Sequence, residues 1–216
     1  MRPLYEHVQA LASARPRSQD SVGVFERDET VVVVIADGGG GIRGGESASR
    51  CLVTVVGSAV NDLGFELESV QAWIDLFKAT DMGLAVNGAG ETTGVVVALG
   101  ARGLIGVSAG DSEAWVVMPT TVEDLTVGQQ TKQRFGSKRA TPTAFQRPVL
   151  GGVLLIASDG LFKYAAIEVI ARIIRNNTMS VAADLLVDLV RLRSGKLADD
   201  VSIVLVRESI ASAGPS

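Results

Sequence analysis

Four aspartates share one context in the sequence, because each stands at the edge of a predicted strand. They are Asp37 in IADGGGG, Asp111 in SAGDSEA, Asp159 in IASDGLF and Asp199 in LADDVSIVLV. A single Asp in a turn is commonly a turn former whose carboxylate accepts a nearby backbone N–H. The recurrence of four in one context predicts a second role, in which the pairing of strands brings several carboxylates into one pocket.

Carboxylates held in one pocket repel one another, so bound cations must offset the repulsion. A site made of oxygen ligands alone favours Mg²⁺ or Mn²⁺ over zinc. Two such ions about 3.5 to 4 Å apart can share a water, lower its pKa and present it as hydroxide in line with a phosphate. The pattern therefore indicates metal-dependent phosphate chemistry that needs no protein nucleophile.

The chain has one histidine, His7, and one cysteine, Cys51, and these counts exclude other chemistries. One histidine cannot build a His-rich dinuclear site or a Ser-His-Asp triad. We interpret His7 as an ordinary surface residue near an N-terminus expected to be mobile. Cys51 falls on the apolar stripe of a predicted helix with no Arg six residues later, so we expect it to pack in the core rather than to attack phosphate.

Composition indicates one domain, spanning residues 1–216, in a reducing compartment. The chain has 216 residues, 47% of them hydrophobic, and a formal net charge of −4, so it can bury a large core and has no overall attraction for nucleic acid. Its apolar runs are shorter than the ~20 residues that cross a bilayer. We therefore expect a cytoplasmic protein that binds neither nucleic acid nor membrane.

The periodicity of apolar residues predicts the elements that would position these aspartates. Valine-rich runs predict strands at 31–36, 94–99, 104–107, 114–118, 153–157 and 201–206. Three- and four-residue spacing predicts helices at 48–63, 67–77, 167–174 and 181–192. Residues 119–150 lack a clean period and predict an irregular excursion, and 209–216 a frayed tail. Strands in groups with helices inserted in pairs favour an α+β sandwich over an alternating parallel sheet.

The aspartate motifs and their order along the chain resemble those of the type 2C, or PPM, protein serine/threonine phosphatases, and the resemblance covers most of the chain. VVIADGGGGIRGGESAS is similar to the family's strand, Asp-Gly-x-Gly-Gly loop and helix, LLIASDGLF to its Ser-Asp-Gly-Leu motif, and ADDVSIVLV to its closing strand. The resemblance implies a four-layer α-β-β-α sandwich of two mainly antiparallel sheets flanked by helix pairs. It also implies that Asp37 bridges two Mn²⁺ or Mg²⁺ ions and that Gly38 offers its backbone carbonyl. Asp159 and Asp199 would complete this catalytic site.

Two further motifs extend the implied site. The stretch Arg15-Pro-Arg-Ser-Gln-Asp20 resembles the family's opening motif, which implies that Arg15 grips the substrate phosphate and that Asp20 supports a metal-bound water. GVSAGDSEAWVV places Asp111 where bacterial members bind a third, weaker metal, and Asp200 would lie beside the site.

The chain departs from the family pattern at three places near these motifs. Ser18-Gln19 replaces the usual Asn-Glu before the acidic residue, and Glu113 replaces the Arg that usually follows Gly-Asp-Ser. Gly39 stands where many relatives carry His or Met, so water, or nothing, would protonate the leaving group.

The resemblance implies hydrolysis of phosphoserine and phosphothreonine in a phosphorylated protein partner, and small bacterial phosphatases suggest, by analogy, a pairing with a Ser/Thr kinase. Three alternatives stay open at this point. A catalytically silent relative could act as a binding or regulatory module, and a phosphatase of small metabolites would use the same metals. The stretch Gly39-Gly-Gly-Ile-Arg-Gly44 also satisfies the dinucleotide-binding pattern G-x-G-x-x-G.

The second half of the excursion at 119–150 is basic. It contains Lys132, Arg134, Lys138, Arg139 and Arg147 with no acidic residue between them. Such a segment is either a solvated loop or a surface that meets an acidic or phosphorylated protein, because cations pair strongly with phosphate.

Overall fold

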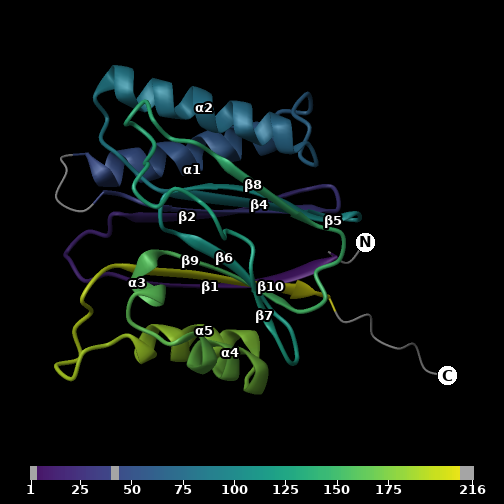
Figure 1. Ribbon diagram of the computed structural model, residues 1–216, viewed down its shortest axis with the longest axis vertical. Helices are drawn as coiled ribbons and strands as arrows, with labels where there is room; N and C mark the ends of the chain where they lie inside the picture. Colours follow the sequence, from purple (N-terminus) through teal and green to yellow (C-terminus); the bar gives the residue numbers. More distant parts are fainter. Residues whose placement is uncertain (1–3, 40–43, 210–216) are drawn as a thin grey trace.

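Two five-stranded antiparallel sheets pack face to face, and helices cover both outer faces (Figure 1). The computed structural model describes residues 4–39 and 44–209. The first sheet has the order β1 (Tyr5–Ala12), β10 (Val201–Glu208), β9 (Val153–Ala157), β6 (Glu113–Val117) and β7 (Val122–Asp124). The second has the order β2 (Asp20–Arg27), β3 (Thr30–Asp37), β4 (Gly94–Gly100), β5 (Gly103–Ala109) and β8 (Thr143–Arg147).

Helix pairs form the two outer layers of the sandwich. The helices α1 (Gly45–Asn61) and α2 (Val70–Asn87) cover the second sheet. The first sheet is covered by α4 (Ile167–Asn176) and α5 (Met179–Leu189), and a single turn, α3 (Asp159–Phe162), follows β9. The predicted four-layer α-β-β-α sandwich is therefore confirmed. A dinucleotide-binding module is wrong for this chain, because it requires a parallel sheet and every strand pair here is antiparallel.

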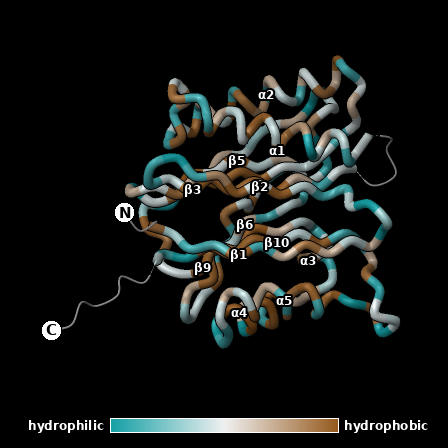
Figure 2. The backbone as a smooth tube through the Cα atoms, turned by 180° about the vertical axis from the view of Figure 1, so that it is seen from behind, coloured by the Kyte–Doolittle hydropathy of each residue, from teal (hydrophilic) through white to brown (hydrophobic). Residues whose placement is uncertain are grey.

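The strand β3 shows why its sequence is a continuous apolar run. Val31, Val33 and Ile35 face the space between the sheets, whereas Val32 and Val34 face the helices α1 and α2. A strand buried on both faces loses the usual alternation of apolar and polar residues. Hydrophobic segments accordingly gather in the strands and hydrophilic ones in the connections (Figure 2). This packing holds the ends of the strands in fixed positions.

The structure bears out the six predicted strands and adds four. The strands β1, β2, β7 and β8 were not predicted. The N-terminus is not mobile from Tyr5 onward, because β1 pairs with β10 along its whole length. His7 lies in β1 with its side chain 33% exposed, 3.5 Å from a carboxylate oxygen of Glu26, in agreement with a surface role.

The second predicted helix is too short, since α2 continues ten residues beyond Phe77 to Asn87. Its buried face includes Thr80 and Asp81, and these polar residues interrupt the apolar spacing on which the prediction depended. Gly88 ends the helix in the left-handed conformation, with φ of 59°.

The excursion at 119–150 is not irregular throughout. It contains β7, and β8 pairs with β5 as the edge strand of the second sheet. The buried carboxylate of Asp81 accepts three backbone N–H bonds from the same segment, from Gly136 at 2.7 Å, Lys138 at 3.1 Å and Ala140 at 3.2 Å. These bonds fasten the segment to α2. Of the predicted stretches, residues 40–43 of the glycine motif and 210–216 of the tail lie outside the described residues.

Candidate metal centre

Three of the predicted aspartates meet at one end of the sandwich. Asp37 is the last residue of β3, Asp111 follows β5 and Asp159 follows β9. In an antiparallel sheet alternate strands run the same way, so β3 and β5 end at the same edge. One carboxylate oxygen from each of the three aspartates lies within 4.8 Å of the other two. The pairing of strands thus brings together residues more than a hundred positions apart in the sequence.

Asp20 and Asp199 lie at the border of this cluster. Asp20 begins β2 directly opposite Asp37 and is 7% exposed. Asp199 precedes β10, and its charge is felt by Asp37, although it is not one of the three whose oxygens converge. Its Oδ1 accepts the backbone N–H of Asp200 at 3.0 Å and lies 3.6 Å from the Arg15 guanidinium.

The cluster is electrostatically unfavourable without a counterion. Burial raises the pKa of Asp37 to about 9, and the negative charges of its neighbours, Asp20 first, add to the effect. Burial likewise raises the pKa of Asp20 to about 6, against the lowering effect of nearby hydroxyls. The pKa of Asp159 is also raised by burial, although Lys163 lowers it. Each shift means that the protein stabilises the charged carboxylates poorly.

The unpaired oxygens of the cluster fit a divalent cation. Asp20 Oδ2, Asp111 Oδ1 and Asp159 Oδ1 are buried and accept no hydrogen bond within the described parts of the chain. A buried acceptor left without a partner costs roughly 1–3 kcal/mol, and more when it is charged. Bound Mg²⁺ or Mn²⁺ would remove that cost, because both ions take carboxylate oxygens as ligands. The donor set and its orphaned oxygens therefore suit such an ion.

A buried network of hydroxyls fixes the backbone at Asp37, and the sequence analysis did not identify it. The Thr93 hydroxyl accepts the Asp37 N–H at 3.1 Å and lies 2.7 Å from the Ser112 hydroxyl. The Thr92 hydroxyl donates to the Asp37 carbonyl at 2.9 Å. The network joins the end of β3, the residues before β4 and Ser112, so one set of bonds fixes the backbone of Asp37 and the neighbour of Asp111.

Gly38 is required by a close approach of two backbone segments. A Cβ built on Gly38 would lie 2.4 Å from the backbone of Gly45, the first residue of α1. Its N–H donates to the Gln19 carbonyl at 3.0 Å. Gly38 therefore lies tightly between Gln19 and the start of α1, and its carbonyl as a metal ligand stays a prediction.

Asp200 organises the segment that carries Arg15. Its carboxylate is 4% exposed and accepts the Ser13 hydroxyl at 2.9 Å and the backbone N–H groups of Ala14 and Gln19 at 2.8 Å each. Arg15 lies between these anchors, near Asp199 and hydrogen-bonded to the Gln19 side chain. The structure thus places Arg15 at the rim of the cluster, and Gln19, a departure from the family pattern, contacts it directly.

Two cationic side chains reach the cluster that the sequence did not assign to it. Lys163 Nζ donates to Asp159 Oδ2, and Arg134 lies 3.8 Å from Asp111 Oδ2. Burial acts to lower the pKa of Lys163, but the bond to Asp159 and the surrounding negative charges outweigh it and raise that pKa. The basic segment therefore does not form one uniform surface. Arg147, another of its members, is paired with Glu123.

Glu113, which stands where the family has Arg, lies beside the same end of the sandwich. Its Oε2 accepts the indole N–H of Trp115 at 2.8 Å. Burial raises the pKa of Glu113 to about 7, with a smaller contribution from the charge of Asp124. The departure therefore places a partly buried carboxyl group with a raised pKa beside the acidic end of the sheets.

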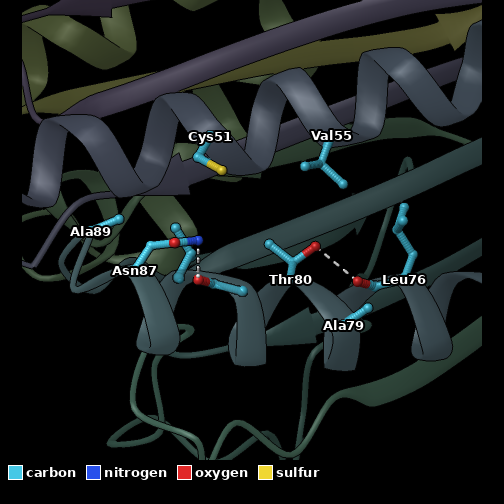
Figure 3. Close-up of a pocket in the computed structure, with 9 residues that line it drawn as sticks. Cys51, Val55, Leu76, Ala79, Thr80, Asn87 and Ala89 are labelled. Atoms are coloured by element: carbon cyan, nitrogen blue, oxygen red, sulfur yellow. Dashed lines mark hydrogen bonds between the residues drawn. The ribbon is translucent and has the colours of Figure 1, made fainter.

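Two hollows differ in their fitness for phosphate. One of about 510 Å³ adjoins the cluster, and its lining is polar: Arg17, Ser18, Asp20, Glu46 and Arg50. Another of about 310 Å³ lies between α1 and α2 and has no charged residue in its lining, which includes Cys51, Val55 and Asn87 (Figure 3). The first hollow therefore offers Arg17 and Arg50 beside two carboxylates, with Arg50 already paired to Glu46.

Cys51 is exposed on α1, so its predicted place in the core is wrong. The buried stripe of α1 instead runs through Ala48, Leu52 and Val56, and Cys51 lies beside it at the hollow.

Among residues 4–39 and 44–209, no helix combines the length and apolar character needed to cross a membrane.

Comparisons with known proteins point to one group. No model of a known protein family matches the chain. The serine/threonine phosphatase stp of Listeria welshimeri is 31% identical over 127 residues, which cover 52% of this chain and 49% of that protein, about half its length.

Solved structures match nearly the whole chain. The serine/threonine phosphatase Stp1 of Staphylococcus aureus has a TM-score of 0.82 at 21% identity, covering 97% of this chain and 96% of its own. The catalytic domain of the phosphatase PstP, in complex with two manganese ions, has a TM-score of 0.77 at 21% identity, covering 94% and 97%. Both comparisons find serine/threonine phosphatases, as the resemblance to the PPM family predicted, and the structural likeness establishes the fold.

Proposed function

We propose that the chain is a metal-dependent serine/threonine phosphatase of the PPM family, which hydrolyses phosphoserine and phosphothreonine in proteins. One observation carries the proposal: carboxylate oxygens of Asp37, Asp111 and Asp159 converge within 4.8 Å, and buried oxygens of Asp111 and Asp159 have no hydrogen-bond partner among the described residues. Such an arrangement is costly unless cations fill it. The similar proteins named above support the same activity.

Asp37, Asp159 and Asp199 would hold the two principal ions, with the Gly38 carbonyl, while Asp20 and Asp111 border them. Bound ions of this kind supply an activated water and neutralise phosphate oxygens. The manganese complex of PstP supports Mn²⁺ as one suitable ion, and the oxygen-only donor set suits Mg²⁺ equally.

Arg15 would bind the substrate phosphate. A guanidinium can donate two parallel hydrogen bonds to phosphate oxygens, which fixes orientation as well as charge. Its side chain is 43% exposed and lies beside Asp199, so it faces both solvent and the metal centre. A phosphate held there would lie between Arg15 and the ions. Gly39 offers no side-chain donor, so the leaving oxygen would take its proton from water.

A protein substrate, rather than a small metabolite, is favoured by the names of the similar phosphatases. The partner would be a phosphorylated protein, and a Ser/Thr kinase would supply it, because the reaction consumes phosphoserine or phosphothreonine. The single exposed cysteine is compatible with the cytoplasm, the compartment we propose.

The test is hydrolysis of p-nitrophenyl phosphate and of a phosphothreonine peptide, with and without Mn²⁺. We expect metal-dependent hydrolysis that Asp37→Ala and Asp159→Ala abolish. Asp184→Ala serves as the matched control, because this carboxylate is exposed on α5, away from the cluster. A folded protein that is inert on both substrates with Mn²⁺ and Mg²⁺ would instead be a silent family member with a binding role.

A further inference from the structure

Lys163 is built into the metal centre by the local fold. It follows the single turn α3, and its backbone N–H donates to the Asp159 carbonyl at 2.9 Å. Residues four apart lie on the same face of a helical turn. The Lys163 side chain therefore returns to Asp159, where Nζ bonds Oδ2.

Arg134 is fixed near the cluster by its neighbour in the chain. Phe135 is fully buried and exchanges two backbone hydrogen bonds with Thr92, at 2.8 and 3.1 Å. Thr92 in turn bonds the Asp37 carbonyl. Arg134 is thus anchored to the end of β3 and lies 3.8 Å from Asp111 Oδ2, with its side chain 26% exposed.

The two cations divide the carboxylates of the cluster into two sets of oxygens. On Asp111 and Asp159 the Oδ2 atoms face a cationic side chain, whereas both Oδ1 atoms are buried and accept no hydrogen bond from residues 4–39 or 44–209. The orphaned oxygens are free to bind metal. The oxygens beside Lys163 and Arg134 already have a positive partner, and a divalent ion there would be repelled by like charge.

We propose that Lys163 and Arg134 take the place of a third metal ion, so that the centre binds two divalent ions and no more. The inference depends on the proposed function, because it assumes that the cluster binds metal at all. It assigns to two residues of this chain the neutralising role that a third ion at Asp111 would have. The resemblance to bacterial phosphatases implied such a third ion. The two expectations therefore differ in the number of metal ions bound per chain.

The test is the number of Mn²⁺ ions bound per chain, measured by calorimetric titration and checked by equilibrium dialysis. We expect two for the natural sequence and a third, weaker ion for the double variant Lys163→Gln, Arg134→Gln. Lys78→Gln is the matched control, since this lysine is exposed on α2, and it should leave the count at two.

Three ions bound to the natural sequence would overturn the inference, as would a double variant that folds and still binds two. The first outcome needs no variant, so the inference stays testable even if the double variant does not fold. A natural protein that binds no Mn²⁺ would overturn the proposed function as well. A count of two or three with phosphatase activity keeps the function and decides the inference alone.

Discussion

The space between the two sheets and the acidic end of the same sheets are built from the same strands but are opposite in character. Between the sheets, Val33, Ile35 and Ile156 pack in a cluster of aliphatic side chains and one tyrosine, Tyr5. Two residues beyond Ile35, Asp37 has a raised pKa and charged neighbours. Burial of the apolar side chains favours folding, whereas burial of the carboxylates opposes it. Burial of apolar surface thus supports an arrangement of charges that is unfavourable alone.

The largest effect is expected at Asp37, one of the residues that would hold the ions. Asp37→Asn should lower phosphatase activity by about 10²- to 10³-fold, because loss of one group that stabilises transition-state charge costs that much. It should also raise the melting temperature of the metal-free protein at neutral pH, because Asn need not take up a proton on folding as the buried Asp37 must. Steady-state kinetics and thermal melting measure the two effects. A metal-free melting temperature that falls would contradict the idea that this end opposes folding.

The interior should respond in the opposite way. Ile156→Ala removes a fully buried side chain from the cluster between the sheets and should cost about 2–5 kcal/mol of unfolding free energy. Metal affinity should stay within a factor of about two, because no bond of the metal centre involves this side chain. Urea unfolding and calorimetry measure the two quantities. Equal losses of stability and metal affinity would show that the two regions are coupled.

Asp200 lies at the border of the two regions. Its substitution tests whether its hydrogen bonds hold Arg15 in position at the site. Asp200→Ala removes the acceptor of three hydrogen bonds that hold residues 13–19, so Arg15 should lose its fixed position. We expect activity to fall by about 10- to 100-fold, the usual loss when a residue that orients a site is removed. Most of the loss should appear in KM, since Arg15 would bind the phosphate. A loss confined to kcat would contradict this.

The sequence predicts the fold and the candidate carboxylates well where one local pattern suffices. Apolar runs rich in valine and isoleucine mark the buried strands, and Asp37, Asp111 and Asp159 stand at or just after the ends of three of them. The contacts that complete the site depend on distant partners, and no local pattern reports them. Lys163 and Arg134 reach Asp159 and Asp111 through the turn after β9 and the pairing with Thr92. The length of α2 was underestimated because the polar residue Asp81 interrupts its apolar spacing. The Asp81 carboxylate is buried because it accepts backbone N–H groups of Gly136 and Ala140, which lie far away in the sequence.

The smallest effect is the pH dependence of stability, and its sign distinguishes the two regions most directly. The folded pKa values of Asp20, Asp37 and Glu113 are raised, to about 6, 9 and 7, by burial. The folded protein therefore holds protons that the unfolded chain has released. The contribution of these three carboxyl groups to stability is therefore greatest below pH ~4. As the pH rises through the folded pKa values this stability is lost, so the metal-free melting temperature should fall by several degrees, about 2–4 °C for each kcal/mol, between pH 5 and 9.

Bound Mn²⁺ should reverse that trend, because metal binds the ionised carboxylates and its affinity increases as they lose protons. The stabilisation by saturating Mn²⁺ should accordingly be larger at pH 8 than at pH 6. Asp37→Asn should remove most of the metal-free slope, whereas Ile156→Ala should lower the melting temperature at every pH and leave the slope unchanged. Thermal melting of the natural protein and both variants at several pH values, with and without Mn²⁺, measures the metal-free slope, the stabilisation by Mn²⁺ and the effect of each substitution. A metal-free melting temperature that rises from pH 6 to 9 would mean that the carboxylates are already neutralised by the protein's own cations, and the contrast between interior and acidic end would then lose its electrostatic basis.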